Sequence, residues 1–267
     1  MNEVGSLEFA QARVQSRHGE RADEAAWQRL EVAREFAALL DAGRQSPLRA
    51  WFVGITAHST SHHVEAQLRA HWRAAVAELA AWMPTIWQPA LLWCAPLPLL
   101  PALQHLLRGG KPARWMLEEP ALQAICGAAP GKRAAALAEG ELAVLAEGGL
   151  AAPAAPLRPG RSLLSAWQAE WQRRLPLPLR GHEDPLWQLV QTLQSHGAAF
   201  ASASSGQGRL LRTALKERLS LLLRRAALEP AAAFIHLVLC ALDLERLRGE
   251  LLLRLLFPRT FSPAQVA

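Results

Sequence analysis

The sequence predicts an all-α protein made of multi-helix bundle units. Good helix formers, above all Ala, Leu, Arg and Glu, dominate the chain from end to end. Tyr is missing altogether, Val and Ile are few, and no segment keeps the period-two alternation of a half-buried strand. Apolar residues instead recur at steps of three and four, which is the spacing of one face of a helix.

The N-terminal part predicts three helices. The first covers residues 7–17. The second covers residues 23–40, with Asp23 as its N-cap, apolar residues on one face and Gly43 beyond its end. Residues 47–61 predict a loop or short turns, and residues 63–82 a third helix.

A long uncharged segment follows. No Lys, Arg, Asp or Glu occurs from residue 79 to residue 107, which is long enough to cross a bilayer as a helix. Five prolines interrupt it, namely Pro84, Pro89, Pro96, Pro98 and Pro101. Because each proline removes a backbone hydrogen bond, we expect two core helices joined by a proline-rich bend rather than a membrane span.

Composition places a domain boundary in the middle of the chain. Residues 127–160 are rich in Ala, Gly and Pro. We therefore expect an N-terminal helical bundle at residues 1–126, a connection at 127–160 and a C-terminal bundle at 161–267. The second bundle predicts helices at residues 162–175, 185–196, 209–228 and 230–257, with Pro230 in the first turn of the last one.

The last helix carries two parallel stripes. Asp243, Arg246, Glu250 and Arg254 recur at steps of three, four and four residues, and leucines repeat the same steps one position later. This pattern predicts a long amphipathic helix. A weaker version occurs at residues 99–110.

Charge and cysteine content bound the function. The net charge of +6 and the isoelectric point near 10.2 favour acidic partners without naming them. The three cysteines are far apart in apolar surroundings, which predicts buried reduced thiols in a reducing compartment. The polar N-terminus lacks the apolar core of a secretory signal, so we expect a cytoplasmic protein.

Few residues suggest catalysis. His58 and His62 lie four residues apart and are the weak candidates for a metal site in a helical enzyme, although no HExxH sequence is present. The predicted helix at 209–228 has a basic face, Arg209, Arg212 and Lys216, which leaves a regulatory or nucleic-acid-binding protein as an alternative. No catalytic residue and no cofactor is predicted.

The chain opens with an aromatic residue and a predicted helix that ends in a Ser-Arg pair, with the residues Phe9, Ala12, Arg13, Val14, Ser16 and Arg17. This opening resembles that of the V0D/AC39 family of V-type and A-type ATPases, whose members begin with an aromatic residue and an ARVRA-like helix that ends in Ser-Arg. A repeated helix similar to D/E-I-x-N-L-R matches Asp243, Leu244, Leu247 and Arg248, and an earlier copy matches Leu103, Leu106, Leu107 and Arg108. Arg246 and Ala102 stand where the family has Asn.

The resemblance implies a non-catalytic adaptor with a funnel-like arrangement of helical bundles. Such an adaptor joins the central stalk of a rotary ATPase to the proteolipid ring in the membrane, and so serves proton or ion transport. Its partners would be those ATPase subunits, with no nucleic acid, and it would sit in the cytoplasm, peripheral to the membrane. For Arg13, Ser16, Arg17, Arg108, Asp243 and Arg248 the implied role is structural, through hydrogen bonds within the bundles.

Overall fold

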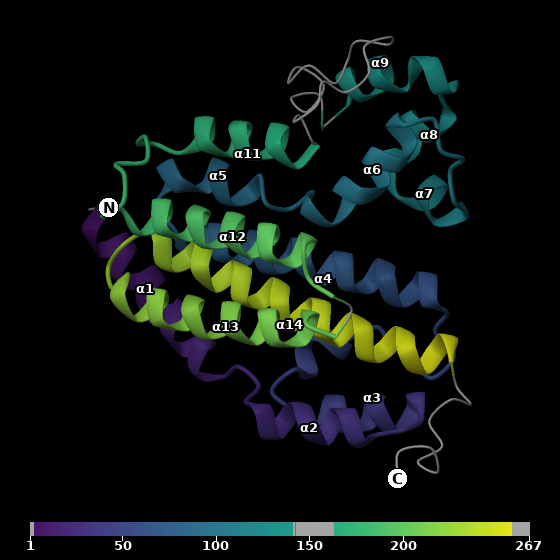
Figure 1. Ribbon diagram of the computed structural model, residues 1–267, viewed down its shortest axis with the longest axis horizontal. Coiled ribbons are helices and arrows are strands. Elements are labelled where there is room, and N and C mark those ends of the chain that lie inside the picture. Colours follow the sequence, from purple (N-terminus) through teal and green to yellow (C-terminus); the bar gives the residue numbers. More distant parts are fainter. Residues whose placement is uncertain (1–2, 141, 143–162, 205, 258–267) are drawn as a thin grey trace. The chain divides into compact units, whose positions relative to one another are not determined.

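The computed structural model is made of helices joined by turns (Figure 1) and describes residues 3–140, 142, 163–204 and 206–257. No strand occurs among these residues, so the predicted all-α class is confirmed. Contacts between Cα atoms divide the chain into two compact units. We call residues 1–88 and 179–267 the terminal unit, and residues 89–178 the central unit.

The terminal unit contains the long helices. Its elements are α1 (Glu3–Gly19), α2 (Glu24–Val32), α3 (Phe36–Arg44), the 3-10 turns η1 (Arg49–Phe52) and η2 (Thr85–Trp87), α4 (Ser61–Trp82), α12 (Pro185–Ala201), α13 (Gly208–Arg225) and α14 (Ala231–Leu256). The central unit holds most of α5 (Gln88–Leu92), then η3 (Leu97–Leu99), α6 (Leu100–Leu107), α7 (Arg114–Glu118), α8 (Pro120–Gly127), η4 (Pro130–Lys132), α9 (Arg133–Ala138) and α11 (Leu163–Arg174).

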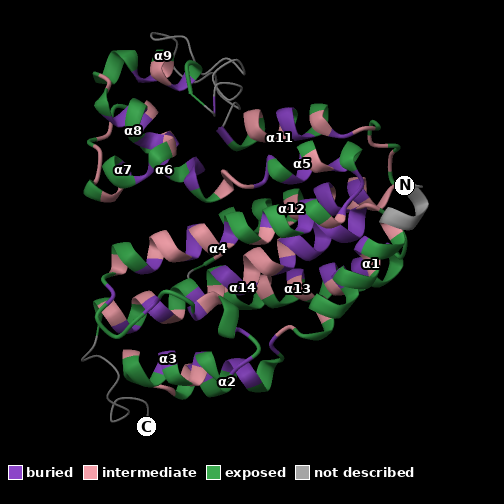
Figure 2. Cartoon of the chain, turned by 180° about the vertical axis from the view of Figure 1, so that it is seen from behind, coloured by how far each residue is buried: buried purple, intermediate pink, exposed green. Residues whose placement is uncertain are grey.

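Helix α14 is the core of the terminal unit. It packs against α1, α3, α4, α12 and α13, and it runs lengthwise through the unit in Figure 1. Every residue from Ala231 to Leu237 is buried, whereas the second half buries one face only (Figure 2). A helix that is apolar all round is a core helix, and the change to an amphipathic pattern marks where its outer face meets polar partners.

The units do not follow the predicted domain boundaries. The predicted N-terminal bundle ends at residue 126, yet α1 and α4 pack on α14, from the other end of the chain. The cause is the apolar first half of α14, which needs cover on all sides. The predicted connection at 127–160 belongs to the central unit, and its residues 141 and 143–160 lie outside the described part.

The predicted helix at residues 23–40 is two helices. Asp23 is the N-cap, as expected, and its carboxylate accepts a hydrogen bond of 2.7 Å from the Ala26 amide. Ala33 then turns to extended backbone and α3 restarts at Phe36. The break frees carbonyls at the end of α2, and a distant arginine, described below, binds them.

Gly43 also differs from its predicted place after a helix end. It lies inside α3, directly beneath the ring of Phe52. A Cβ atom at this position would overlap the ring. The glycine is therefore required by the close approach of the ring and not by a helix terminus.

The uncharged segment is not one continuous helix. By length and composition Thr85–Leu107 is apolar enough to cross a membrane, and half of it is buried in the fold. Its residues form η2, α5, η3 and α6, as separate short helices. The prolines thus divide the segment as expected, but into four short helical elements and not the two helices predicted.

Hydrogen bonds from side chains to backbone carbonyls join separate segments of the central unit at two places. The indole nitrogen of Trp93 donates to the Trp167 carbonyl at 3.1 Å, and that of Trp167 donates to the Trp93 carbonyl at 2.8 Å. Arg133, which is 4% exposed, donates to the carbonyls of Leu106 and Gly110 at 2.8 and 2.6 Å. It thereby satisfies acceptors left free at the end of α6.

Candidate functional site

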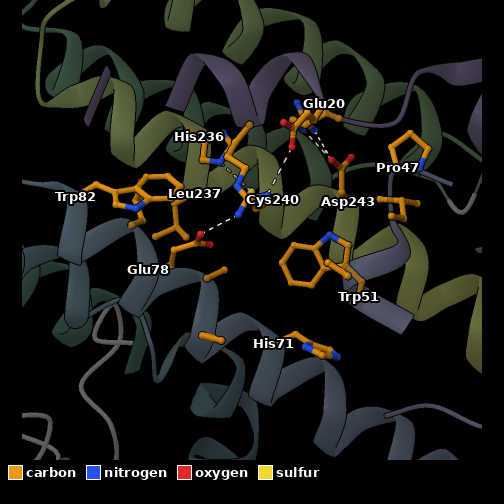
Figure 3. A pocket seen from close by; sticks show the side chains of 17 residues that line it. Glu20, Pro47, Trp51, His71, Glu78, Trp82, His236, Leu237, Cys240 and Asp243 are labelled. Atoms are coloured by element: carbon orange, nitrogen blue, oxygen red, sulfur yellow. Dashed lines mark hydrogen bonds and ion pairs between the residues drawn. The ribbon is translucent and has the colours of Figure 1, made fainter. Parts of the chain in front are cut away.

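A cavity of about 390 Å³ opens in the terminal unit between α1, α4, α14 and the turn around η1 (Figure 3). This volume is within the range of ligand pockets in proteins. Apolar side chains of α4, of the turn around η1 and of Leu237 on α14 form much of its wall, and three aromatic side chains, Trp51, His71 and Trp82, line it as well. The cavity is therefore mostly apolar, with a few charged groups at defined places.

A buried ion pair closes one side of the cavity. Nε and Nη2 of Arg21 donate to Oδ2 of Asp243 at 2.8 and 2.6 Å, and Nη2 also donates to the Leu239 carbonyl. The two side chains are only 10% and 7% exposed. The ammonium of Lys216 lies 3.8 Å from the other oxygen of Asp243. One carboxylate of α14 thus holds the turn after α1 and helix α13.

A second ion pair lies nearer to solvent. The Arg17 guanidinium on α1 donates to Glu78 on α4 at 2.8 Å, and both side chains are about half exposed. This hydrogen bond to Glu78 is the main reason that the pKa of Arg17 is raised. Arg13, one turn earlier, lies over the ring of Trp82 at 5.6 Å. The two arginines therefore fasten α1 to α4 beside the cavity.

His236 and Cys240 are the side chains of the site that resemble a nucleophile and its base. The Cys240 sulfur lies 3.5 Å from Nε2 of His236, one turn earlier on α14. Burial raises the pKa of the Cys240 thiol to about 12. Burial also lowers the pKa of His236 to about 4, with Arg21 adding to the effect. At neutral pH the pair is therefore a thiol and an uncharged imidazole, which is a poor arrangement for nucleophilic attack.

The polar stripe of α14 faces protein rather than solvent. Arg246 makes a two-pronged contact with Glu24 at 2.9 and 2.8 Å, reaches Glu31 at 2.6 Å, and lies over the ring of Trp27 at 4.5 Å. Burial opposes the charge of Arg246, but its hydrogen bonds to the two glutamates outweigh that effect and raise its pKa. The stripe therefore holds α2 against α14.

Arg254 binds the broken end of α2. Its side chain is 1% exposed, and its guanidinium donates to the carbonyls of Leu30, Glu31 and Ala33 and pairs with Glu250 at 2.7 Å. A cation at a helix C-terminus is favoured by the helix dipole and by its free carbonyls. This contact explains how the chain tolerates the break between α2 and α3.

The remaining predicted structural residues have different surroundings. Arg248 donates to Glu65 of α4 at 2.7 Å, and that bond raises its pKa. Ser16 contacts Glu20 at 3.4 Å on the surface of α1. Arg108 is exposed at the C-cap of α6, in the central unit. The structure thus brings Arg13, Arg17, Asp243 and Arg248 into one unit and leaves Arg108 in the other.

The two histidines predicted as weak metal candidates, His58 and His62, do not lie on one face of a helix. Helix α4 begins at Ser61 with Thr60 as its N-cap, so His58 precedes the helix and does not share a face with His62. Both imidazoles are exposed, and the neighbouring His63 contacts the Gly54 carbonyl at 2.9 Å. Within residues 3–140, 142, 163–204 and 206–257, no group of three or more His, Cys, Asp and Glu is placed to hold a metal ion.

Sequence reasoning misses the cavity and three of its groups. Nothing local singles out Arg21, although it follows the first helix directly, and the pairing of His236 with Cys240 is not among the expectations. The i, i+4 spacing of these two on an apolar helix is the available signal. The aromatic wall carries no local signal, because Trp51 precedes α4 and His71 and Trp82 lie eleven residues apart on it.

No known protein family, curated protein or solved structure matches this chain.

Proposed function

We propose that this chain is a non-catalytic adaptor, similar to the protein that joins the central stalk of V-type and A-type rotary ATPases to the membrane rotor ring. The proposal starts from the resemblance of its two ends to that family. One observation carries it further: matching residues of both ends, Arg13 and Arg17 on α1 and Asp243 and Arg248 on α14, lie in one unit and link its helices.

Stiffness is the property that an adaptor between rotating parts requires. Torque passes through a body only if its helices do not slide on one another, and tight packing together with cross-linking ion pairs supplies that resistance. Three arginines of α14 supply such links, because Arg246 and Arg254 bind α2 and Arg248 binds α4. These contacts join segments about 180 to 220 residues apart in the sequence.

The site chemistry supports the same proposal. The thiol of Cys240 has its pKa raised to about 12, and the carboxylate of Asp243 is taken up by Arg21 and Lys216. Both groups therefore serve packing and charge pairing at neutral pH. The aromatic wall of the cavity, by contrast, suits an inserted apolar side chain of a partner.

The test is gentle affinity purification of the tagged full chain from membranes, followed by identification of the proteins that accompany it. We expect stalk and proteolipid subunits of a rotary ATPase to be recovered with the chain. A charge-reversal variant, Arg248→Glu, which opposes Glu65 with a like charge, should recover less of them. Recovery of none, from a preparation in which other membrane assemblies stay intact, would overturn the proposal.

Two other outcomes would point to the alternatives. Zinc that stays bound in equal amount after dialysis, and is lost in His58→Ala, would indicate a metal site. Binding of DNA or RNA that weakens steeply with salt would indicate a nucleic-acid-binding protein.

A further inference from the structure

The outward face of α13 carries two exposed leucines on a line of coiled-coil spacing. Leu215, Leu219, Leu222 and Leu223 point inward and are buried. On the opposite face Leu210 is 72% exposed and Leu221 is 53% exposed. They belong to a line of exposed residues at steps of four, three, four and three: Leu210, Ala214, Glu217, Leu221 and Arg224. Two helices that pack along each other meet at this spacing.

The arginines of α13 fall into two sets. Arg209 and Arg212 are ion-paired with glutamates of α2 and α14. Arg218, Arg224 and Arg225 are exposed, and no ion pair joins them to any residue that the structure describes. The line that holds the two exposed leucines therefore ends in Arg224 and is flanked by Arg218 and Arg225, and Glu217 is the one acid in it.

A third exposed leucine follows the end of the helix. Leu228 is 57% exposed and has a backbone φ of 60°. The left-handed region costs a leucine about 1 kcal/mol or more, because its Cβ approaches the following carbonyl. The chain thus keeps an apolar side chain at the surface, in an unfavourable conformation, just after the basic end of α13.

We propose that this face of α13 docks an acidic amphipathic helix of a partner protein. Leucines of the partner would cover Leu210 and Leu221, and its carboxylates would meet Arg218, Arg224 and Arg225. The inference rests on the proposed adaptor function and adds the chemistry of the partner surface. Opposite charges along a leucine seam set partner choice and orientation in paired helices.

Two other occupants fit the face less well. A second copy of this chain would bring arginines against arginines, which costs free energy. A lipid surface requires a broad apolar face on the helix that lies in it. The broad apolar face of α13 is buried within the terminal unit, and the exposed line is one residue wide and contains Glu217.

The test uses the full chain and a synthetic probe. The probe is a dye-labelled helical peptide of about three heptads with leucines at heptad positions a and d and glutamates at the flanking positions, and its binding is followed by fluorescence anisotropy. We expect binding that weakens about tenfold or more in Leu221→Asp, and similarly in the double variant Arg218→Glu/Arg225→Glu. Raising the salt concentration should also weaken it.

The controls separate this face from general charge and from misfolding. The variant Arg29→Glu/Arg34→Glu makes the same charge change at exposed arginines of α2 and its C-terminal end, and it should bind like the parent chain. A peptide with lysines in place of the glutamates should not bind. All variants change exposed residues, and circular dichroism melting should show that each keeps the parent fold.

Several results would overturn the inference. These are equal binding by the parent chain and both face variants, equal binding of the lysine peptide, or binding to phosphatidylglycerol vesicles that is lost in Leu221→Asp while the acidic peptide does not bind. Peptide binding without recovery of ATPase subunits from membranes would leave the docking face standing and remove the adaptor function. Full recovery of those subunits by a Leu221→Asp chain, together with no peptide binding by the parent chain, would keep the adaptor function and remove the docking face.

Discussion

The Arg21–Asp243 pair allows a quantitative test of how the terminal unit is held together. In Asp243→Ala the guanidinium of Arg21 loses two hydrogen bonds, at 2.8 and 2.6 Å, while its side chain remains only 10% exposed. Leaving one member of a buried ion pair without its partner costs about 3–5 kcal/mol. For a chain of this size that corresponds to a fall of roughly 10 °C in the melting temperature.

The assay is urea unfolding of the parent chain and three variants, followed by circular dichroism. Asp41→Ala is the control, because its ion pair with Arg44 is exposed and should contribute less than about 1 kcal/mol. The double variant Arg21→Met/Asp243→Leu should regain most of the loss, since it removes both charges and keeps the volume. The reasoning is refuted if Asp243→Ala is no more destabilising than Asp41→Ala, or if the double variant is no more stable than Asp243→Ala.

Three further predictions concern other parts of the terminal unit. The pKa of His236 is lowered to about 4 in the fold, so between pH 6.5 and 4 the unfolded chain binds a proton there that the folded chain does not. The free energy of unfolding should therefore fall by about 3 kcal/mol as the pH falls through this range. Urea midpoints measured across the range should show this fall, and His236→Phe should reduce it. Arg254→Met leaves three carbonyls of α2 without their donor and should cost about 3 kcal/mol, with faster amide hydrogen exchange at the end of α2; unchanged exchange there would contradict the proposed cap. Gly43→Ala places a methyl group against the ring of Phe52 and should cost about 1–3 kcal/mol in thermal unfolding, a loss that Phe52→Leu in the same chain should partly restore.

The all-α class and most helices followed from sequence because local signals decide them. Asp23 caps α2, Pro230 precedes α14, and α14 ends at Leu256, one residue before the predicted end. Composition excluded strands without any tertiary information. These features depend on residues within a few positions of one another.

The break between α2 and α3 depends on residues far apart in the chain. Local propensity at Ala33 favours a continued helix, and the structure ends α2 there because Arg254, more than 200 residues later, binds the freed carbonyls. The cavity has the same character. Its walls come from four segments, and no spacing rule within one segment could have joined Trp51 to Cys240.

The polar stripe of α14 was predicted correctly from its spacing, but its surroundings were not. Asp243, Arg246, Glu250 and Arg254 are spaced as the outer face of an amphipathic helix. In the fold Asp243 and Arg254 are buried, and Arg246 is tied to two glutamates. The periodicity identifies the stripe, but only the fold shows that its members bind α2 and the turn after α1.

The construction of the terminal unit from both ends of the chain has a consequence during synthesis. About 150 residues separate the end of α4 from the start of α14, which takes a ribosome roughly 10 to 30 s to translate. For that time the nascent helices α1 and α4 lack the core helix that covers them, whereas the central unit has all its residues about 50 residues before α14 begins. Chaperones that shield apolar surface are therefore needed most by the first hundred residues, and early termination before α14 leaves a fragment prone to aggregate.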